Sequence, residues 1–203
     1  MSDPGNAREV SGTGADYMGF IFYPGSKRYV GRDPDKSLFS SVPGKILKVG
    51  VFVNEKTAEL LRIARKYSLE LVQLHGAETP ADCRTIRSAG FGVIKSFGIE
   101  PDFNFDALAS YIPEVDHFLF DTRSDHHGGT GTRFNWEILD QYDFEKSFFL
   151  SGGIGPDHAE EILAFQHPSF HGVDINSRFE IFPGVKDIDK LKTFITHIKS
   201  RKT

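Results

Sequence analysis

Short apolar segments recur along the chain, and each is followed by a stretch whose apolar residues have helical spacing. Seven of the segments have the length of strands: Tyr17–Phe22, Lys48–Val53, Leu71–Leu74, Gly92–Phe97, His117–Phe120, Phe148–Leu150 and Gly172–Ile175. Most are continuously apolar, as expected for parallel strands that are covered on both faces. The alternation predicts βαβ units around a parallel sheet.

Helix starts are marked by a small polar residue or a glycine, in most cases followed by proline, which is favoured at the first helical position. The predicted starts are Asp33-Pro34, Asn54, Thr79-Pro80 and Gly155-Pro156, with an opening helix from Asp3-Pro4 to Val10 and a final helix from about Asp187 to Lys199. No Pro/Ser-rich linker divides the sequence, so we expect residues 1–203 to form one domain.

Two α/β architectures accommodate seven strands in regular βα units: an open doubly wound sheet, or a (βα)₈ barrel with one strand unaccounted for. Polar and glycine-rich segments follow almost every strand at its carboxyl end, where barrel enzymes build their sites. This favours the TIM barrel. In a barrel, a chain that starts with the helix at Asp3-Pro4 lacks the opening strand.

Composition narrows the classes of protein. The 203 residues are 39% apolar and 26% charged, and the formal net charge is −4, which argues against a polyanionic partner such as nucleic acid. The lone cysteine, Cys83, rules out an intramolecular disulfide framework. No segment has the apolar length of a membrane span and the start MSDPGNAREV is too polar for a signal peptide, so we expect a cytoplasmic protein.

Two turns after consecutive strands could hold a phosphate group. Ser151-Gly152-Gly153 follows Phe148–Leu150, and Asn176-Ser177 follows Gly172–Ile175. Glycines allow close approach of the backbone, and a helix start beyond each turn presents unpaired N–H groups. The alternative is a pair of ordinary tight turns.

Three side chains are candidates for substrate chemistry. Asp121 ends an apolar strand, where partial burial could raise the pKa of its carboxyl and suit it to act as a general acid; alternatively it caps a turn or pairs with Arg123. Arg28 could bind a carboxylate with its planar fork, or be a solvated loop charge. His75 follows a strand and could face the site or stabilise a turn.

The segment Asp125–Gly131 carries two adjacent histidines, which point apart on an extended chain and lack further ligands nearby. We therefore expect no metal site there, and interpret the segment as a glycine-shaped mobile loop. Cys83 is expected to be a small buried residue rather than a nucleophile.

Taken in order, the motifs resemble the phosphoribosylanthranilate isomerase family of tryptophan biosynthesis. The similar stretches are GADYMGFIFYPGSKRYV (14–30), KVGVFVN (48–54), VQLHGAE (72–78), LFDT (119–122), GGTGTRFNW (128–136), LSGGI (150–154) and GVDINSRFE with PGVKD (172–187). The resemblance covers essentially the whole chain. It implies a (βα)₈ barrel and an Amadori rearrangement of N-(5′-phosphoribosyl)anthranilate to 1-(2-carboxyphenylamino)-1-deoxyribulose 5-phosphate, with no cofactor.

The resemblance also assigns roles to residues. Asp121 would be the general acid that protonates the ribose ring oxygen, and Arg28 would lie beside the anthranilate group. His75 would line the site. The phosphate would be bound by residues of the two turns: Gly152, Gly153, Asp174, Asn176 and Ser177. The expected partner is a small phosphorylated molecule, with the protein a monomer or homodimer and neither nucleic acid nor membrane involved.

The start of the chain departs from the family pattern. The family's first strand carries a Lys-Xaa-Cys-Gly motif whose cysteine is the general base, followed by Met-Xaa-Asp-Pro, which Met1-Ser2-Asp3-Pro4 resembles. We therefore expect the first strand to be missing, with a gap between Tyr17–Phe22 and Gly172–Ile175 and an impaired reaction. The competing hypothesis is a non-catalytic, phosphate-binding barrel remnant. Cys83 cannot supply the base, because it falls on an outer helix.

Overall fold

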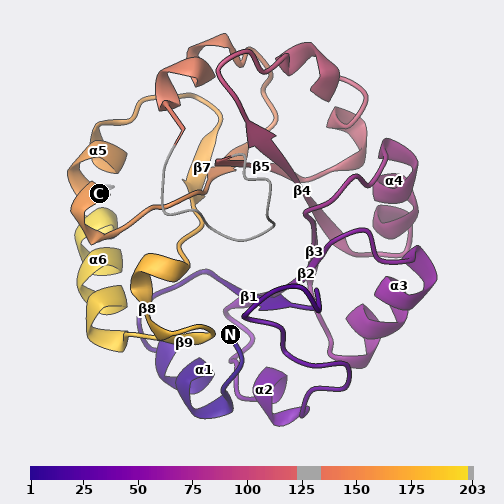
Figure 1. The fold of residues 1–203 in the computed structure, drawn as a ribbon, viewed down its shortest axis with the longest axis vertical. Helices are drawn as coiled ribbons and strands as arrows, with labels where there is room; N and C mark the ends of the chain where they lie inside the picture. The colour runs from indigo at the N-terminus through magenta and orange to yellow at the C-terminus, as the bar shows by residue number, and fades with distance from the viewer. Residues whose placement is uncertain (123–133, 201–203) are drawn as a thin grey trace.

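The fold is a half-barrel of parallel strands surrounded by helices (Figure 1). The computed structural model describes residues 1–122 and 134–200. In these ranges seven parallel strands follow one another in chain order, β1 to β7. They are β1 (Tyr17–Ile21), β2 (Leu47–Phe52), β3 (Leu71–Leu74), β4 (Gly92–Ile99), β5 (His117–Thr122), β6 (Phe148–Leu150) and β7 (Phe170–Val173). The seven predicted strands and the α/β class are thus confirmed.

The helices begin where local capping favours them. They are α1 (Pro4–Val10), α2 (Ser37–Ser40), α3 (Thr57–Lys66), α4 (Pro80–Ser88), α5 (Ala159–Ala164) and α6 (Ile188–Ser200). Asp3 caps α1 by accepting a 2.7 Å hydrogen bond from the Asn6 N–H, and Thr79 and Asp82 form a reciprocal capping box on α4. No helix in the described ranges is long and apolar enough to cross a membrane.

Several connections are 3-10 helices where the sequence predicted only βα units. They span Phe105–Leu108, Ile112–Glu114, Trp136–Gln141, Pro156–His158 and Ser177–Phe179. Asn104 and Asn135 each cap the segment that follows by accepting a backbone hydrogen bond two residues ahead. Such local bonds compete with α-helical pairing. The helix predicted at Asp33-Pro34 is correspondingly short and begins only at Ser37.

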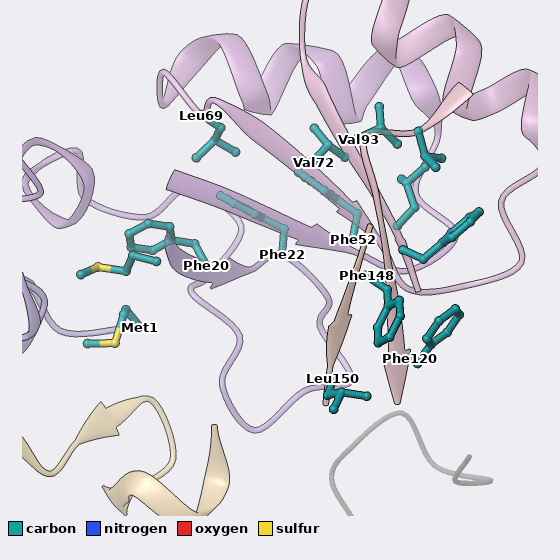
Figure 2. Close-up of a cluster of buried hydrophobic side chains, with 14 of the residues drawn as sticks. Met1, Phe20, Phe22, Phe52, Leu69, Val72, Val93, Phe120, Phe148 and Leu150 are labelled. Carbon is teal, nitrogen blue, oxygen red and sulfur yellow. The ribbon is translucent and has the colours of Figure 1, made fainter. Parts of the chain in front are cut away.

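The sheet has two differently packed faces. One face encloses a ring of apolar side chains inside the half-barrel: Val49, Leu71, Ile94, Leu119 and Phe149. The other face packs against the helices in a larger cluster. Figure 2 shows labelled members of that cluster, among them Phe52, Val72 and Phe120. These three side chains are fully buried. Burial on both faces accounts for the continuously apolar strand sequences.

In the described part of the chain, β1 and β7 are the outer strands of the sheet. At the amino ends of these strands the Tyr17 hydroxyl lies 3.1 Å from His171 Nε2. Towards the carboxyl ends, the Met1 amino group donates a 2.8 Å hydrogen bond to the Gly19 carbonyl oxygen on β1. The outer strand β7 covers Phe170–Val173, two residues earlier than the predicted segment, so Asp174 follows the strand instead of lying within it.

A two-stranded hairpin, β8 (Glu180–Phe182) and β9 (Val185–Lys186), was not predicted from the sequence. It lies beside α1 and the N-terminus in Figure 1. Asn6 fixes it there, because its side chain donates to the Lys186 carbonyl at 2.9 Å and accepts from the Lys186 N–H at 2.7 Å. The hairpin thereby brings residues 180 and 186 to the carboxyl ends of the strands.

Candidate active site

A cavity of about 1740 Å³ occupies the inside of the half-barrel. All eight side chains or turns predicted as site residues line it: Arg28, His75, Asp121, Gly152, Gly153, Asp174, Asn176 and Ser177. They come from the carboxyl ends of five different strands or from the loops that follow, which the fold gathers at the carboxyl edge of the sheet. The cavity also runs between β1 and β7, where Tyr17, His171 and the α6 residues Leu191 and Ile195 line it.

Asp121 lies at the end of β5 in the wall of this cavity. Its Oδ1 accepts a 2.8 Å hydrogen bond from the N–H of Thr122, and its Oδ2 lies 3.5 Å from Nε2 of His75. His75 is held at the end of β3, because its N–H donates to the Phe52 carbonyl at 2.9 Å. The acid and the imidazole predicted separately therefore form one pair. Arg123, the alternative partner of Asp121, lies outside the described residues.

A second carboxyl group, that of Asp174, follows β7 close to Asp121. Burial, reinforced by the negative charge of Asp121, raises the pKa of Asp174 above its ordinary value. The Ser151 hydroxyl is 3.4 Å from its Oδ2. Of the two carboxyl groups, Asp174 is thus in surroundings that favour the protonated form.

The turn after β6 brings the backbone of Gly152 close to Asp121. Gly152 has φ +91° and Gly153 has φ +61°, in the left-handed region that favours glycine. A Cβ on Gly152 would lie 2.8 Å from Asp121 Oδ1 and equally close to the Thr122 backbone nitrogen. The glycine is therefore needed for this close approach of the turn to Asp121 and Thr122.

Arg28 is held in an ion pair, which differs from the alternative interpretation that it is a solvated loop charge. Its Nε and Nη2 donate to both carboxylate oxygens of Glu180 at 2.6–2.9 Å, and its side chain is 15% exposed. Lys186 Nζ donates to the same carboxylate at 3.1 Å and to Asn176 Oδ1 at 2.6 Å. Burial alone would raise the pKa of Glu180, but these two cations lower it to about 2.

Sequence reasoning missed Glu180 and Lys186. Both cations, Arg28 and Lys186, line the cavity, and Glu180 lies behind them as their shared anion. The Pro183-Gly184 pair between residues 180 and 186 is a turn signal that could have predicted the hairpin. The contact of Glu180 with Arg28, 152 residues away in sequence, could not have been predicted in this way.

Other candidates lie away from this cluster. Cys83 is fully buried in α4 within the larger apolar cluster, and burial raises the pKa of its thiol to about 11. In the ranges that are described, no group of three or more His, Cys, Asp or Glu residues is arranged to hold a metal ion. The segment Asp125–Gly131, considered above for a metal or a mobile loop, lies outside those ranges.

Comparisons of the sequence and of the structure with known proteins identify the same family. The family model described as N-(5′-phosphoribosyl)anthranilate (PRA) isomerase matches residues 2–197. A protein of Parabacteroides distasonis named N-(5′-phosphoribosyl)anthranilate isomerase is 48% identical over 199 residues, covering 98% of this chain and 90% of its own.

Solved structures agree. The crystal structure of phosphoribosyl anthranilate isomerase from Thermotoga maritima superposes with a TM-score of 0.86 at 33% identity, over 98% of this chain and 96% of that one. A further isomerase structure, in complex with reduced 1-(o-carboxyphenylamino)-1-deoxyribulose 5-phosphate, gives a TM-score of 0.83 at 32% identity, over 98% and 95% of the two chains.

Proposed function

The chain belongs to the N-(5′-phosphoribosyl)anthranilate isomerase family, and on that premise we propose that Asp121 and the turns around it carry the family's Amadori rearrangement. The activity is that of an isomerase of tryptophan biosynthesis, converting an aminoaldose into an aminoketose. The observation that supports this assignment most strongly is the convergence of all eight candidate residues on one cavity at the carboxyl edge of the sheet.

Asp121 acts as the general acid. Its carboxyl proton passes to the ring oxygen of the ribose, and the bond between that oxygen and C1 breaks with its electron pair going to the oxygen. The lone pair of the anthranilate nitrogen forms the iminium. Loss of the C2 proton to a base then gives the enolamine, which tautomerises to the ketone. In support of the first of these steps, the Asp121 carboxyl lies in the cavity wall beside the His75 imidazole.

The phosphate group binds between the Gly152-Gly153 turn and the Asn176-Ser177 turn. The backbone of two left-handed glycines is accessible to a bulky anion, and Lys186, tied to Asn176, adds positive charge at the same wall. The raised pKa of Asp174 serves the same purpose, because a protonated carboxyl donates a hydrogen bond to phosphate where a carboxylate would repel it.

Arg28 binds the carboxylate of the anthranilate group. The Nε and Nη2 atoms of Arg28 donate to Glu180, and these bonds fix the plane of the guanidinium group in the cavity wall. A fixed guanidinium loses little conformational entropy when it binds a second carboxylate.

The groove between β1 and β7 is the place of an eighth parallel strand, which would be the first strand of a (βα)₈ barrel; residues 1–203 form the rest of this single domain. In support, the Met1 nitrogen already pairs with the Gly19 carbonyl at the outer edge of β1, so a strand leading into Met1 would run along that edge. That strand would carry the base. We further propose a cytoplasmic enzyme, monomeric or homodimeric, that needs no cofactor and acts on a small phosphorylated substrate.

Replacement of Asp121 by Asn tests the acid. The amide cannot deliver a proton, so turnover of phosphoribosylanthranilate should fall by about 10²–10⁴-fold when it is measured in a chain extended ahead of Met1 by the strand that carries the base. Affinity for the reduced product analogue should change less than about threefold, since no proton is transferred on binding.

Asp116→Asn is the matched control, because Asp116 precedes the same strand at its opposite end and accepts a bond from the Val93 N–H that Asn can also accept. Near-normal turnover of Asp121→Asn would reject the acid role. Binding of the analogue with no turnover in any variant would favour the non-catalytic alternative.

A further inference from the structure

Gln73 is a polar side chain between two apolar neighbours inside the half-barrel. It lies on β3 between Val51 of β2 and Ile94 of β4, and it is 7% exposed. The interior cluster to which its neighbour Ile94 belongs is wholly apolar: Val49, Leu71, Ile94, Leu119 and Phe149. A buried amide costs free energy unless it is hydrogen-bonded, so a leucine or methionine of similar volume would be the simpler choice for packing.

The amide is used in a bond to the imidazole of the active-site pair. Gln73 Nε2 lies 3.0 Å from Nδ1 of His75. Residues 73 and 75 are two apart on an extended segment, so their side chains share the inner face of the sheet. An amide N–H can donate only to an unprotonated ring nitrogen, and the proton of the neutral imidazole then resides on Nε2.

That proton is directed at the proposed acid, since His75 Nε2 is the ring atom that lies 3.5 Å from Asp121 Oδ2. In the other tautomer the Nε2 lone pair would face the carboxylate and repel it. With Nε2 protonated, the imidazole donates to the negative charge that develops on Asp121 as its proton leaves. Hydrogen bonds in apo sites are often long and tighten in the substrate complex.

We infer that Gln73 is a positioning residue: it fixes His75 in the Nε2–H tautomer, which stabilises the carboxylate of Asp121 during ring opening. This inference rests on the acid role proposed above for Asp121. Gln73 itself need not touch the substrate. The bond from His75 Nε2–H to the Asp121 carboxylate is a hydrogen bond to a charged group. Its loss should lower turnover by about 10- to 100-fold.

Two variants separate this role from packing. Gln73→Met removes the donor while keeping the length of the side chain. Gln73→Glu replaces the donor with an acceptor, which selects the tautomer with the proton on Nδ1. Ile94→Val is the control, because it removes one methyl group from the neighbouring strand and leaves the amide in place.

The readout independent of activity is ¹⁵N NMR of imidazole-labelled protein, with the His75 signals assigned by their loss in His75→Asn. We expect a protonated Nε2 in the unmodified chain and in Ile94→Val, a mixture of tautomers in Gln73→Met, and a protonated Nδ1 in Gln73→Glu. Turnover should fall in both Gln73 variants, with KM within about threefold of its original value.

An Nδ1–H tautomer in the unmodified chain, or a tautomer unaltered by both Gln73 variants, would overturn the inference. A changed tautomer with unchanged turnover would overturn it equally. Failure of the acid role itself would be recognised separately, by normal turnover in Asp121→Asn.

Discussion

The two ends of the parallel sheet both carry titratable side chains, but of different kinds. At the carboxyl end are the carboxyl groups of Asp121 and Asp174 and the cations Arg28 and Lys186, all of them lining the cavity. At the amino end lies a cluster of rings: Tyr17 on β1, His117 on β5 and His171 on β7, packed around Phe149.

The His117 ring at the amino end is held in its neutral state. The His117 and His171 rings are 4.5 Å apart between centroids, and His117 Nδ1 lies 2.7 Å from the Ser147 hydroxyl. Burial, together with the neighbouring His171, lowers the pKa of His117 to about 4. At neutral pH the His117 ring is therefore uncharged, whereas the Glu180 carboxyl at the other end stays ionised.

The difference indicates a division of labour along the same strands. Neutral rings contribute by packing, and their loss should change stability. Charged side chains at the mouth of the cavity are paired, so their loss should change chemistry or binding, and also stability where a buried partner is left without its counter-ion. Four changes at the two ends and in the groove between β1 and β7 test this division, in order of decreasing effect.

The largest effect is expected from adding a strand in the groove between β1 and β7. An extension ahead of Met1 that places a Lys-Xaa-Cys-Gly strand between β1 and β7 should raise turnover by about 10²–10⁴-fold, since it supplies the general base at the carboxyl end. The same extension with alanine in place of cysteine is the control: it should raise the melting temperature equally without the gain in turnover. Equal rates with and without the extension would show that the base lies elsewhere.

Replacing Glu180 by Gln should cost about 3 kcal/mol of unfolding free energy at neutral pH, because Arg28 and Lys186 are left buried without their anion. The pKa of Glu180 is lowered to about 2, so its stabilising effect is present above its ordinary pKa of 4.5 and is lost as the pH falls towards 2. Urea unfolding from pH 7 to pH 3 should therefore show the two proteins converging. A constant difference across this range would contradict the pairing.

Gly152→Ala should lower turnover by about 10- to 100-fold, since the new Cβ displaces the Asp121 carboxylate from its place. Gly31→Ala is the control for backbone strain: its φ is +100°, yet a Cβ there meets no atom within 4 Å. Gly152→Ala should lose more stability than Gly31→Ala, because its Cβ also meets the Thr122 backbone nitrogen, and turnover should fall in Gly152→Ala alone. Equal turnover in the two would place the acid elsewhere.

The smallest effect is expected at the amino end, from His117→Gln. A pKa lowered to about 4 means that the unfolded chain binds a proton before the folded one does, so stability declines as the pH falls from 6.5 to 4. Asp116 opposes this lowering, and His171 and Lys146 reinforce it. In His117→Gln, the loss of unfolding free energy between pH 6.5 and pH 4 should be smaller by about 1–2 kcal/mol, a figure that allows for the partial exposure of His117. Turnover should be unchanged. Altered turnover would contradict the division between the two ends.

Much of the fold could be predicted from local patterns. Continuous apolar runs marked the seven strands, and caps such as Thr79 marked helix starts, because both depend on neighbours in sequence. The 3-10 connections were not predicted, since a single Asn or Pro decides between two helical forms of similar energy. The role of Asp121 remains a prediction, although its place at a strand end was correctly inferred.

The sequence by itself determined which residues end each parallel strand, and hence which side chains meet at one edge, because strands of one direction share their carboxyl end. Only the tertiary structure decided how those side chains pair. Glu180 reaches Arg28 across 152 residues, Met1 reaches Gly19 at the outer edge of β1, and His75 reaches Asp121 two strands away. Such contacts depend on sheet curvature and on the docking of a hairpin, which arise from the packing of the whole chain and leave no local pattern in the sequence.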